Sequence, residues 1–336
     1  MADKQLDVLS VGDVVTDAFI KLLDDEARVD KTDNGPRLSM PYGSKVPFDH
    51  AVIVPAVGNS ANASVAFAKL GLKSGLVSNI GDDDWGREIL RSLRRAKVDT
   101  RFVHINARKN SNYHYVLWYK EDRTILIKHE AYDYRWPRFR VVDIPKWIYF
   151  SSVAHGTLEY HDEITEWLDS CPTVKLAFQP GTFQLEIGAQ KLKRIYARSE
   201  VLAVNRQEAA LIAGKRHEDD IHELLDKLHE LGPKIVLISD GHLGAYASDG
   251  TSRYKMPIYP DPAPPYDRTG AGDAFTSTFV GAVMLGADIA GALLWAPVNA
   301  MSVVQKVGAQ AGLLTEREIE HYLRLAPENY HPRKMN

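Results

Sequence analysis

Apolar and polar residues alternate along the chain in a pattern that becomes regular after about residue 146. Short apolar, β-branched runs predict buried strands at residues 147–150, 174–178, 201–204 and 235–239. Stretches with apolar residues at helical spacing predict helices near residues 159–170, 185–198, 206–213 and 221–231. Strands that alternate with helices indicate a mostly parallel sheet that helices cover on both faces.

The first part of the chain is less regular. It predicts strands at residues 6–11, 51–54 and 76–80 and helices at residues 59–70 and 85–96. Two β-rich runs at residues 113–119 and 124–128 flank a polar turn, which is typical of a hairpin. Residues 13–55 are rich in turn-forming clusters such as Thr-Asp-Asn-Gly-Pro.

Composition and charge narrow the protein class. The chain has 336 residues, of which 45% are hydrophobic and 25% charged, as in ordinary globular proteins. A net charge of −3 does not favour nucleic acid or an anionic membrane as a partner. Cys171 is the only cysteine, which excludes an internal disulfide framework. The start of the chain does not resemble a signal peptide and no apolar run is long enough to cross a membrane, so we expect a cytoplasmic protein.

The glycine turn at residues 270–273 is the first candidate site. The apolar spacing that follows predicts a helix, so these residues would form its first turn. The free amides and the macrodipole of a first turn attract an anion. Asp273 then has two interpretations: a helix cap, or a base that takes a proton from a hydroxyl beside a phosphoryl group.

Four further stretches lie at predicted strand–helix junctions. Asn59 and Asn62, beside Gly58, could bind hydroxyl groups or cap a helix. Asp17 follows the first strand and could accept from ligand hydroxyls or belong to a turn. In the third stretch, Asn205 and Glu208 could form a capping box. In the fourth, Ser239, Gly241 and Gly244 could let the backbone bend against a nucleotide or form a tight hairpin.

Taken together, these motifs resemble the ribokinase-like (PfkB) carbohydrate kinase family. Its signature Asp-Thr-Thr-Gly-Ala-Gly-Asp-x-Phe is close to residues 267–275, and the resemblance extends from Asp7 to about Leu314. It implies an α/β fold: a three-layer α/β/α core with a mostly parallel central sheet and a small β-sheet lid. It also implies a single kinase domain over residues 1–336, with lid segments at approximately 13–55 and 103–130.

The resemblance also implies roles for individual residues. Asp273 would be the catalytic base, and the amides of Gly270, Ala271, Gly272 and Asp273 would form the anion hole. The sugar would contact Asp17, Gly58, Asn59 and Asn62. The nucleotide would lie along Ser239, Gly241 and Gly244, with Asn205 and Glu208 supporting Mg²⁺ and phosphate through water, and Asn299 lining the adenine pocket.

By this resemblance the protein is expected to transfer the γ-phosphate of ATP, with Mg²⁺, to a small sugar of the ribose or fructose type. A nucleoside kinase is the alternative, and a non-catalytic sugar or nucleotide sensor is a further one. Asp267 and Gly308 are compatible with a monovalent cation such as K⁺. Val57 and Arg268 depart from the family pattern, and we expect Arg268 to face solvent rather than a phosphate. Lid aromatics could stack on a nucleobase, but we expect them to form the lid core or the face of a homodimer.

Overall fold

The structure is a computed structural model that describes residues 5–33, 35–120, 122–215 and 220–335. Its largest element is a ten-stranded sheet. The strands of this sheet are β1 (Val8–Val11), β6 (Ser74–Gly81), β7 (Asp99–Asn106), β10 (Trp147–Phe150), β11 (Lys175–Phe178), β12 (Val201–Asn205), β13 (Ile235–Ser239), β14 (Ala245–Ser248), β15 (Arg253–Met256) and β16 (Arg333–Lys334).

The strand order is β16-β15-β14-β13-β12-β11-β10-β1-β6-β7. Neighbouring strands from β13 to β7 are parallel, and β14, β15 and β16 extend the sheet in antiparallel fashion. The carboxyl ends of the parallel strands therefore meet at one edge, where such sheets bind ligands. This arrangement confirms the predicted mostly parallel central sheet.

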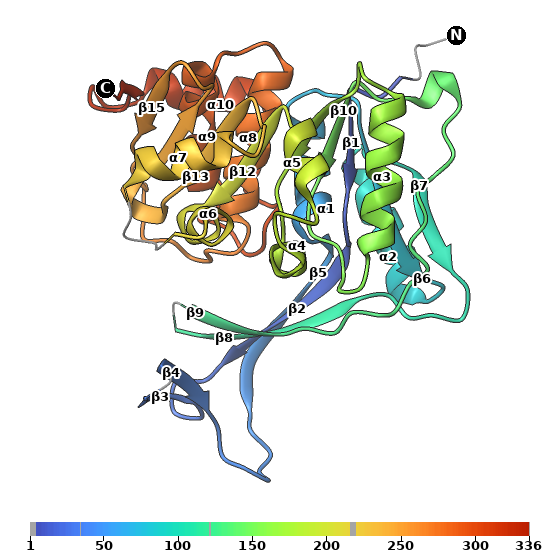
Figure 1. The fold of residues 1–336 in the computed structure, drawn as a ribbon. Helices are drawn as coiled ribbons and strands as arrows, with labels where there is room; N and C mark the ends of the chain where they lie inside the picture. Colours follow the sequence, from blue (N-terminus) through green and yellow to red (C-terminus); the bar gives the residue numbers. More distant parts are fainter. Residues whose placement is uncertain (1–4, 34, 121, 216–219, 336) are drawn as a thin grey trace.

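Helices cover both faces of this sheet, as Figure 1 shows. Successive strand residues point to opposite faces, so Val8 and Tyr149 belong to one core cluster and Leu9 and Ile148 to another. The helices on the first face are α1 (Asn59–Lys69), α2 (Asp84–Arg95), α8 (Ala271–Met284), α9 (Ile289–Val303) and α10 (Glu316–Arg324). Those on the second face are α3 (Leu158–Ser170), α4 (Thr182–Ile187), α5 (Lys193–Arg198), α6 (Arg206–Ala213) and α7 (Ile221–His229). The predicted three-layer core is thus confirmed.

A second, four-stranded sheet projects from the core and forms the lid (Figure 1). Its order is β5 (Phe48–Val57), β2 (Val15–Leu22), β8 (Tyr113–Tyr119) and β9 (Asp122–Leu126). A separate two-stranded ribbon, β3 (Arg28–Thr32) with β4 (Gly35–Ser39), lies at its far end. Only β2 and β8 pair in parallel; the other lid neighbours are antiparallel.

Several predicted boundaries differ from the structure. Residues 103–106, assigned to the lid, lie in β7 and pair with β6 of the large sheet. The helix predicted at residues 185–198 is two helices, because α4 ends at Ile187 and the next residue, Gly188, has a φ of 87° that breaks the helical backbone. The second hairpin strand begins at Asp122 rather than Thr124, and Glu121 in the predicted turn lies outside the described residues.

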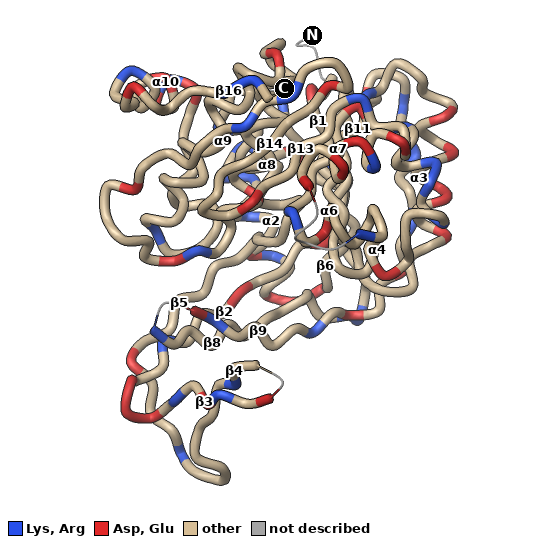
Figure 2. Tube along the Cα trace, turned by 60° about the vertical axis from the view of Figure 1, so that its left-hand side comes forward, with Lys and Arg blue, Asp and Glu red and all other residues tan. Residues whose placement is uncertain are grey.

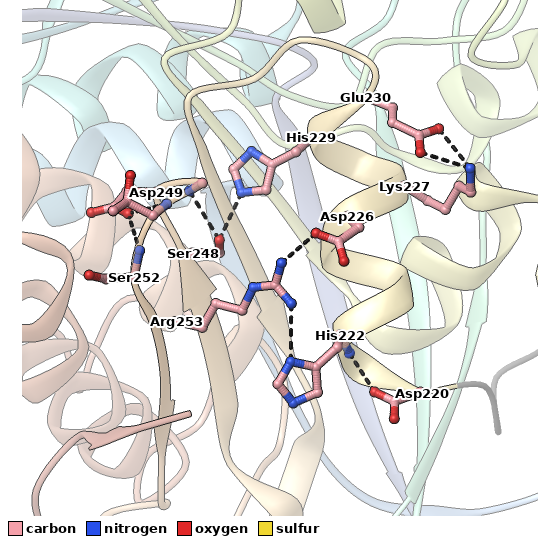
Figure 3. A network of polar contacts seen from close by, with 12 residues as sticks. Asp220, His222, Asp226, Lys227, His229, Glu230, Ser248, Asp249, Ser252 and Arg253 are labelled. Atoms are coloured by element: carbon pink, nitrogen blue, oxygen red, sulfur yellow. Dashed lines mark hydrogen bonds and ion pairs between the residues drawn. The ribbon is translucent and has the colours of Figure 1, made fainter. Parts of the chain in front are cut away.

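Side-chain contacts join the antiparallel edge of the sheet to α7 (Figure 3). Arg253 of β15 donates to His222 Nδ1 at 3.1 Å and forms an ion pair with Asp226. One turn further on, His229 Nε2 lies 2.9 Å from Ser248 Oγ of β14. These contacts hold α7 against strands that helix α9 covers from the other face.

Charged residues of both signs are interspersed along the trace, including on the projecting lid (Figure 2). Within the described ranges, no helix combines the length and the apolar character needed to cross a membrane.

Candidate functional site

Asp273 lies in the first turn of α8, where its carboxylate faces α1. Gly270 occupies the N-cap with φ 79°, and Asp273 makes no capping hydrogen bond, so the cap interpretation is wrong. Instead, Asn59 Nδ2 donates to Asp273 Oδ1 at 3.0 Å and Asn62 Nδ2 donates to Oδ2 at 2.8 Å. Capping by either asparagine is also excluded, because Gly58 is the N-cap residue of α1 and no side chain caps that helix.

Two further side chains orient the groups around this carboxylate. Gln179, directly after β11, points its Nε2 to Asp273 Oδ1 at 3.4 Å, and Tyr149 donates its hydroxyl to the Oε1 of the same amide. Gln310 donates to Asn62 Oδ1 at 2.9 Å, which turns the Asn62 amine toward Asp273. Burial raises the pKa of Asp273, and the three amide donors offset part of that rise. A buried carboxylate with an elevated pKa is suited to accept a proton.

A pocket of about 330 Å³ adjoins the first turn of α8. Ser239, Gly241 and Gly244 line it on one side and Ala271 and Gly272 on the other. The structure thus brings five of the residues selected from the sequence to one cavity. Most of its remaining wall is apolar, and residues 257–259, Phe275 and α9 contribute to it.

Asn299 does not line this pocket, contrary to the expectation. Pro297, Ala300, Met301 and Val304 face it at helical spacing. Asn299 points away, is fully buried, donates to Thr278 Oγ1 at 2.7 Å and accepts from the Leu314 amide at 2.9 Å. Its role in the structure is to join α8, α9 and the following loop.

Arg268 is exposed but also lines the pocket, so its side chain lies beside the cavity rather than wholly in solvent. Asp267, beside it, is buried and joins two loops. Its Oδ1 accepts from the amide and the hydroxyl of Thr269, and its Oδ2 accepts from the Gly308 amide at 2.9 Å. Both oxygens therefore already have partners from the protein.

Asn205 and Glu208 form the capping box that the sequence allowed. Glu208 N donates to Asn205 Oδ1, and Asn205 N donates to Glu208 Oε2, each at 2.9 Å. Burial raises the pKa of Glu208, and the charge of Asp273 adds to that rise, so the two carboxylates sense each other electrostatically. The described residues include no group of three or more His, Cys, Asp or Glu side chains that could hold a metal ion by themselves.

Asp17 lies at the other end of the site, on lid strand β2, opposite His114 of β8. The distance from Asp17 Oδ1 to His114 Nδ1 is 3.5 Å, and the same distance separates Asp13 Oδ2 from His129 Nδ1. The loop at Asp13 touches α1, because a Cβ at Gly58 would stand 2.7 Å from the Asp13 carbonyl oxygen. The rings of His114 and His129 lie 5.3 Å apart, so Asp17 is connected to Asp13 through the two imidazoles and, through Gly58, to the Asp273 site.

The site residues that were not selected from the sequence include Gln179, Gln310, Asp13 and Tyr149. Gln179 directly follows a predicted strand, at residues 174–178, and that position was an available signal. Gln310 lies in a stretch without periodicity and gives no such signal.

Comparisons with known proteins found similar sequences and similar solved structures. The model of the pfkB family carbohydrate kinases matches residues 44–316. The chain is 28% identical to a ribokinase of Bacillus subtilis, over 79% of this chain and 87% of that protein. It is also 28% identical to a cytidine kinase of Thermococcus kodakarensis, over 82% and 87% respectively. The solved structure of Arabidopsis thaliana ribokinase complexed with ribose and ATP superposes with a TM-score of 0.76 at 19% identity, covering 95% of this chain and 99% of that one.

Proposed function

The chain belongs to the pfkB family of carbohydrate kinases, and we propose that it transfers the γ-phosphate of ATP to a hydroxyl group of a small sugar of the ribose or fructose type. The observation that carries this proposal is the position of Asp273. Its partly buried carboxylate accepts from Asn59 and Asn62, and it directly follows Gly272, which lines the pocket with Ser239.

In the proposed reaction, Asp273 takes the proton of the acceptor hydroxyl as its oxygen bonds to the γ-phosphorus. The bond from that phosphorus to the oxygen bridging to the β-phosphate breaks, and ADP leaves with the electron pair. The amides of residues 270–273 hold the phosphoryl oxygens at the N-terminus of α8, where the dipole favours negative charge. Asn59 and Asn62 hold the acceptor, and Asp17 binds its far end.

The pocket beside α8 is the proposed ATP site. Gly244 permits a close turn there, because its φ is 95° and a Cβ would overlap the Met256 carbonyl. Mg²⁺ would neutralise the ATP phosphates, held by them and by water next to Glu208 rather than by a protein cage. The capping box leaves Glu208 Oε1 available for such a water, which fits this role.

A monovalent cation such as K⁺ is proposed to bind backbone carbonyls of the two loops joined by Asp267 and Gly308. Because Asp267 already accepts from Thr269 and Gly308, it would shape this site rather than act as an open ligand. Exchange of K⁺ for tetramethylammonium should lower turnover. An unchanged rate would remove the cation from the proposal.

Two copies are proposed to pair through the lid. Ile53, Ala18, Tyr115 and Leu126 are in register across the lid sheet. Ile53, Tyr115 and Leu126 are each about half exposed. An exposed apolar row of this kind favours a protein interface.

A nucleoside is the second candidate acceptor. The identity to the cytidine kinase equals the identity to the ribokinase. Among the aromatic residues of the lid, Trp118 lies on the face of β8 opposite Tyr115 and could stack on a base.

The deciding experiment is an ADP-release assay with Mg-ATP over ribose, fructose, glucose, ketodeoxygluconate, fructose 6-phosphate, ribose 1-phosphate, adenosine, inosine and cytidine. We expect turnover of a sugar, reduced by about two to four orders of magnitude in Asp273→Asn. Near-normal turnover in that variant would refute the assignment of the base. Turnover of nucleosides alone would select the second candidate.

A further inference from the structure

A second cavity lies at the β7 edge of the large sheet, and we call it the edge cavity. Its volume is about 410 Å³, within the range of roughly 300–1,000 Å³ that is usual for small-molecule sites. Residues of β6 and β7 form one wall, and residues 133–138 form another. The edge cavity shares no lining residue with the pocket beside α8, so it is a separate place on the molecule.

Cationic side chains outnumber anionic ones in this lining. It contains Arg101, Arg135 and Arg138 but only one carboxylate, that of Asp133, which pairs with Arg135. Arg101 donates to two carboxylates outside the cavity through Nε and Nη1, which leaves its Nη2 for a ligand. Arg138 is exposed and has no ion-pair partner in the part of the chain that the structure describes. Guanidinium groups in this number favour a carboxylate or a phosphate.

A buried donor belongs to the same lining. Asn79 of β6 is only 6% exposed, and its Oδ1 accepts from Asn106 Nδ2 at 3.1 Å, which fixes the amide and leaves its Nδ2 as the free end. Among the described residues, neither Asn79 Nδ2 nor the indole Nε1 of Trp136, which also lines the cavity, has an acceptor. Because buried donors are nearly always bonded, two donors without acceptors indicate an occupant that accepts hydrogen bonds.

Aromatic rings form the apolar part of the lining. Phe102 and Trp136 both line the cavity, and their ring centroids lie 5.0 and 5.5 Å from that of Phe139, which holds them in place. An inorganic ion would leave these ring surfaces uncovered, whereas an apolar or aromatic body would bury them. The lining as a whole therefore suits an organic anion with a carboxylate or phosphate group on a flat apolar body.

One wall of the edge cavity is also connected to the Asp273 site. Tyr134, which lies between lining residues in the sequence, donates its hydroxyl to Asp13 Oδ1 at 2.7 Å. The carbonyl of Asp13 in turn approaches Gly58, the residue before Asn59. An occupant that orders residues 133–138 would therefore also hold the Tyr134 hydroxyl against Asp13.

We propose that the edge cavity is a second ligand site, that it binds a small organic anion, and that this anion is an effector of the enzyme. The oxygens of the anion accept from Arg101, Arg138 and Asn79, and its body lies against Phe102 and Trp136. Binding does not depend on the proposed kinase function, whereas the effect on catalysis rests on it. Because the bound anion has already ordered the Tyr134 segment, the acceptor KM should fall about five-fold or more.

Calorimetry on the full chain tests binding. Mg²⁺ and the non-hydrolysable analogue AMP-PNP are present at saturation, so that the proposed phosphoryl site is filled. The probes are benzoate and phenyl phosphate, which distinguish carboxylate from phosphate, together with inorganic phosphate and neutral benzyl alcohol. We expect one equivalent of benzoate or phenyl phosphate to bind, inorganic phosphate to bind more weakly and benzyl alcohol not to bind. Equal binding of benzyl alcohol, or binding of neither aromatic anion, would overturn the proposal.

Two variants place the bound anion in the edge cavity. Arg138→Ala removes an exposed side chain, so it should fold normally and weaken anion binding about ten-fold. Asn79→Asp keeps an oxygen that accepts from Asn106 but replaces the free donor with an anionic oxygen, so it should abolish binding. Arg317→Ala is the matched control, because this exposed arginine lies on α10 outside the cavity, and its affinity should equal that of wild type. Wild-type affinity in Arg138→Ala would refute the site.

Tyr134→Phe separates binding from its effect on catalysis. The acceptor KM is measured with and without the anion, using the sugar that gives turnover in the ADP-release assay. Tyr134→Phe should bind the anion as wild type does, yet its acceptor KM should no longer respond to it. Anion binding that leaves the wild-type acceptor KM unchanged would refute the effector role. Anion binding by a protein that transfers no phosphoryl group would support the site and refute the kinase function.

Discussion

At the scale of single residues, Asp273 is a carboxylate in a desolvated position, and desolvation disfavours its charged form. Its pKa is raised, so its ionisation lowers the stability of the folded state as pH rises from the ordinary aspartate value through the folded pKa. The same elevated pKa strengthens it as a proton acceptor. Stability and activity therefore place opposite demands on this side chain.

Asp273→Asn should reveal this opposition. The oxygen of the new asparagine can accept from Asn62, whose amide is held in place by Gln310. Its amine can donate to the Asn59 side chain if the Asn59 amide flips so that its oxygen faces residue 273. Urea unfolding should show the variant gaining stability over wild type between pH 4 and pH 7, with no gain at pH 3.5. In wild type, kcat/KM should fall toward acid with a midpoint above the ordinary value of about 3.9. A stability difference independent of pH would contradict the assigned charge.

Gly270 and Gly272 allow a matched comparison within one turn. A Cβ at Gly270 would stand 2.5 Å from Ala309 Cα and the φ of 79° is strained for alanine, whereas nothing lies within 4 Å of a Cβ at Gly272. Gly270→Ala should lose about 2–4 kcal/mol of unfolding free energy. Gly272→Ala should keep its Tm yet lose turnover, because its methyl group would enter the proposed phosphoryl site. Normal turnover in Gly272→Ala would argue against the proposal that the phosphoryl group closely approaches the amides of residues 270–273.

At the scale of elements, Asn299 couples three segments. Asn299→Ala would leave the Thr278 hydroxyl and the Leu314 amide buried without partners. Chemical denaturation should show a loss of about 2–5 kcal/mol, from two unsatisfied groups, while the KM for ATP changes little. In a double-mutant cycle, the losses of unfolding free energy caused by Asn299→Ala and Thr278→Val should not add, because the two side chains share one hydrogen bond. A selective rise in the ATP KM at unchanged stability would restore Asn299 to the nucleotide site.

Elements with a strong period were predictable from sequence, and those without one were not. The predicted helix at residues 206–213 and strand at residues 113–119 coincide with α6 and β8. Strand β3 of the two-stranded ribbon, Arg-Val-Asp-Lys-Thr, is largely exposed. Because neither of its faces is buried, its sequence shows no alternation of apolar and polar residues that would predict a strand. The same limit applies to the site: the glycine turn is local in sequence, whereas Gln179 lies 94 positions from Asp273 and only folding brings the two together.

At the scale of the whole molecule, the lid presents an apolar row to solvent. If two copies pair there, light scattering should give a dimer mass for wild type. Tyr115→Lys should shift it to a monomer, because the row centres on Tyr115. Tyr42→Lys, a fully exposed position outside the lid sheet, is the control and should leave the mass unchanged. A monomeric wild type would refute the proposed lid interface.

The place of β1 in the large sheet also affects how the chain folds during synthesis. This strand, Val8–Val11, hydrogen-bonds on one side to β6 and on the other to β10, which begins at Trp147. At about 5–20 residues per second, the ribosome would complete β10 roughly 7–30 s after β1. For that interval a strand that is fully buried in the native sheet has at least one unpaired edge, which is a hazard for aggregation. The nascent chain therefore depends on α1 and β6 to shield β1 until its second neighbour emerges.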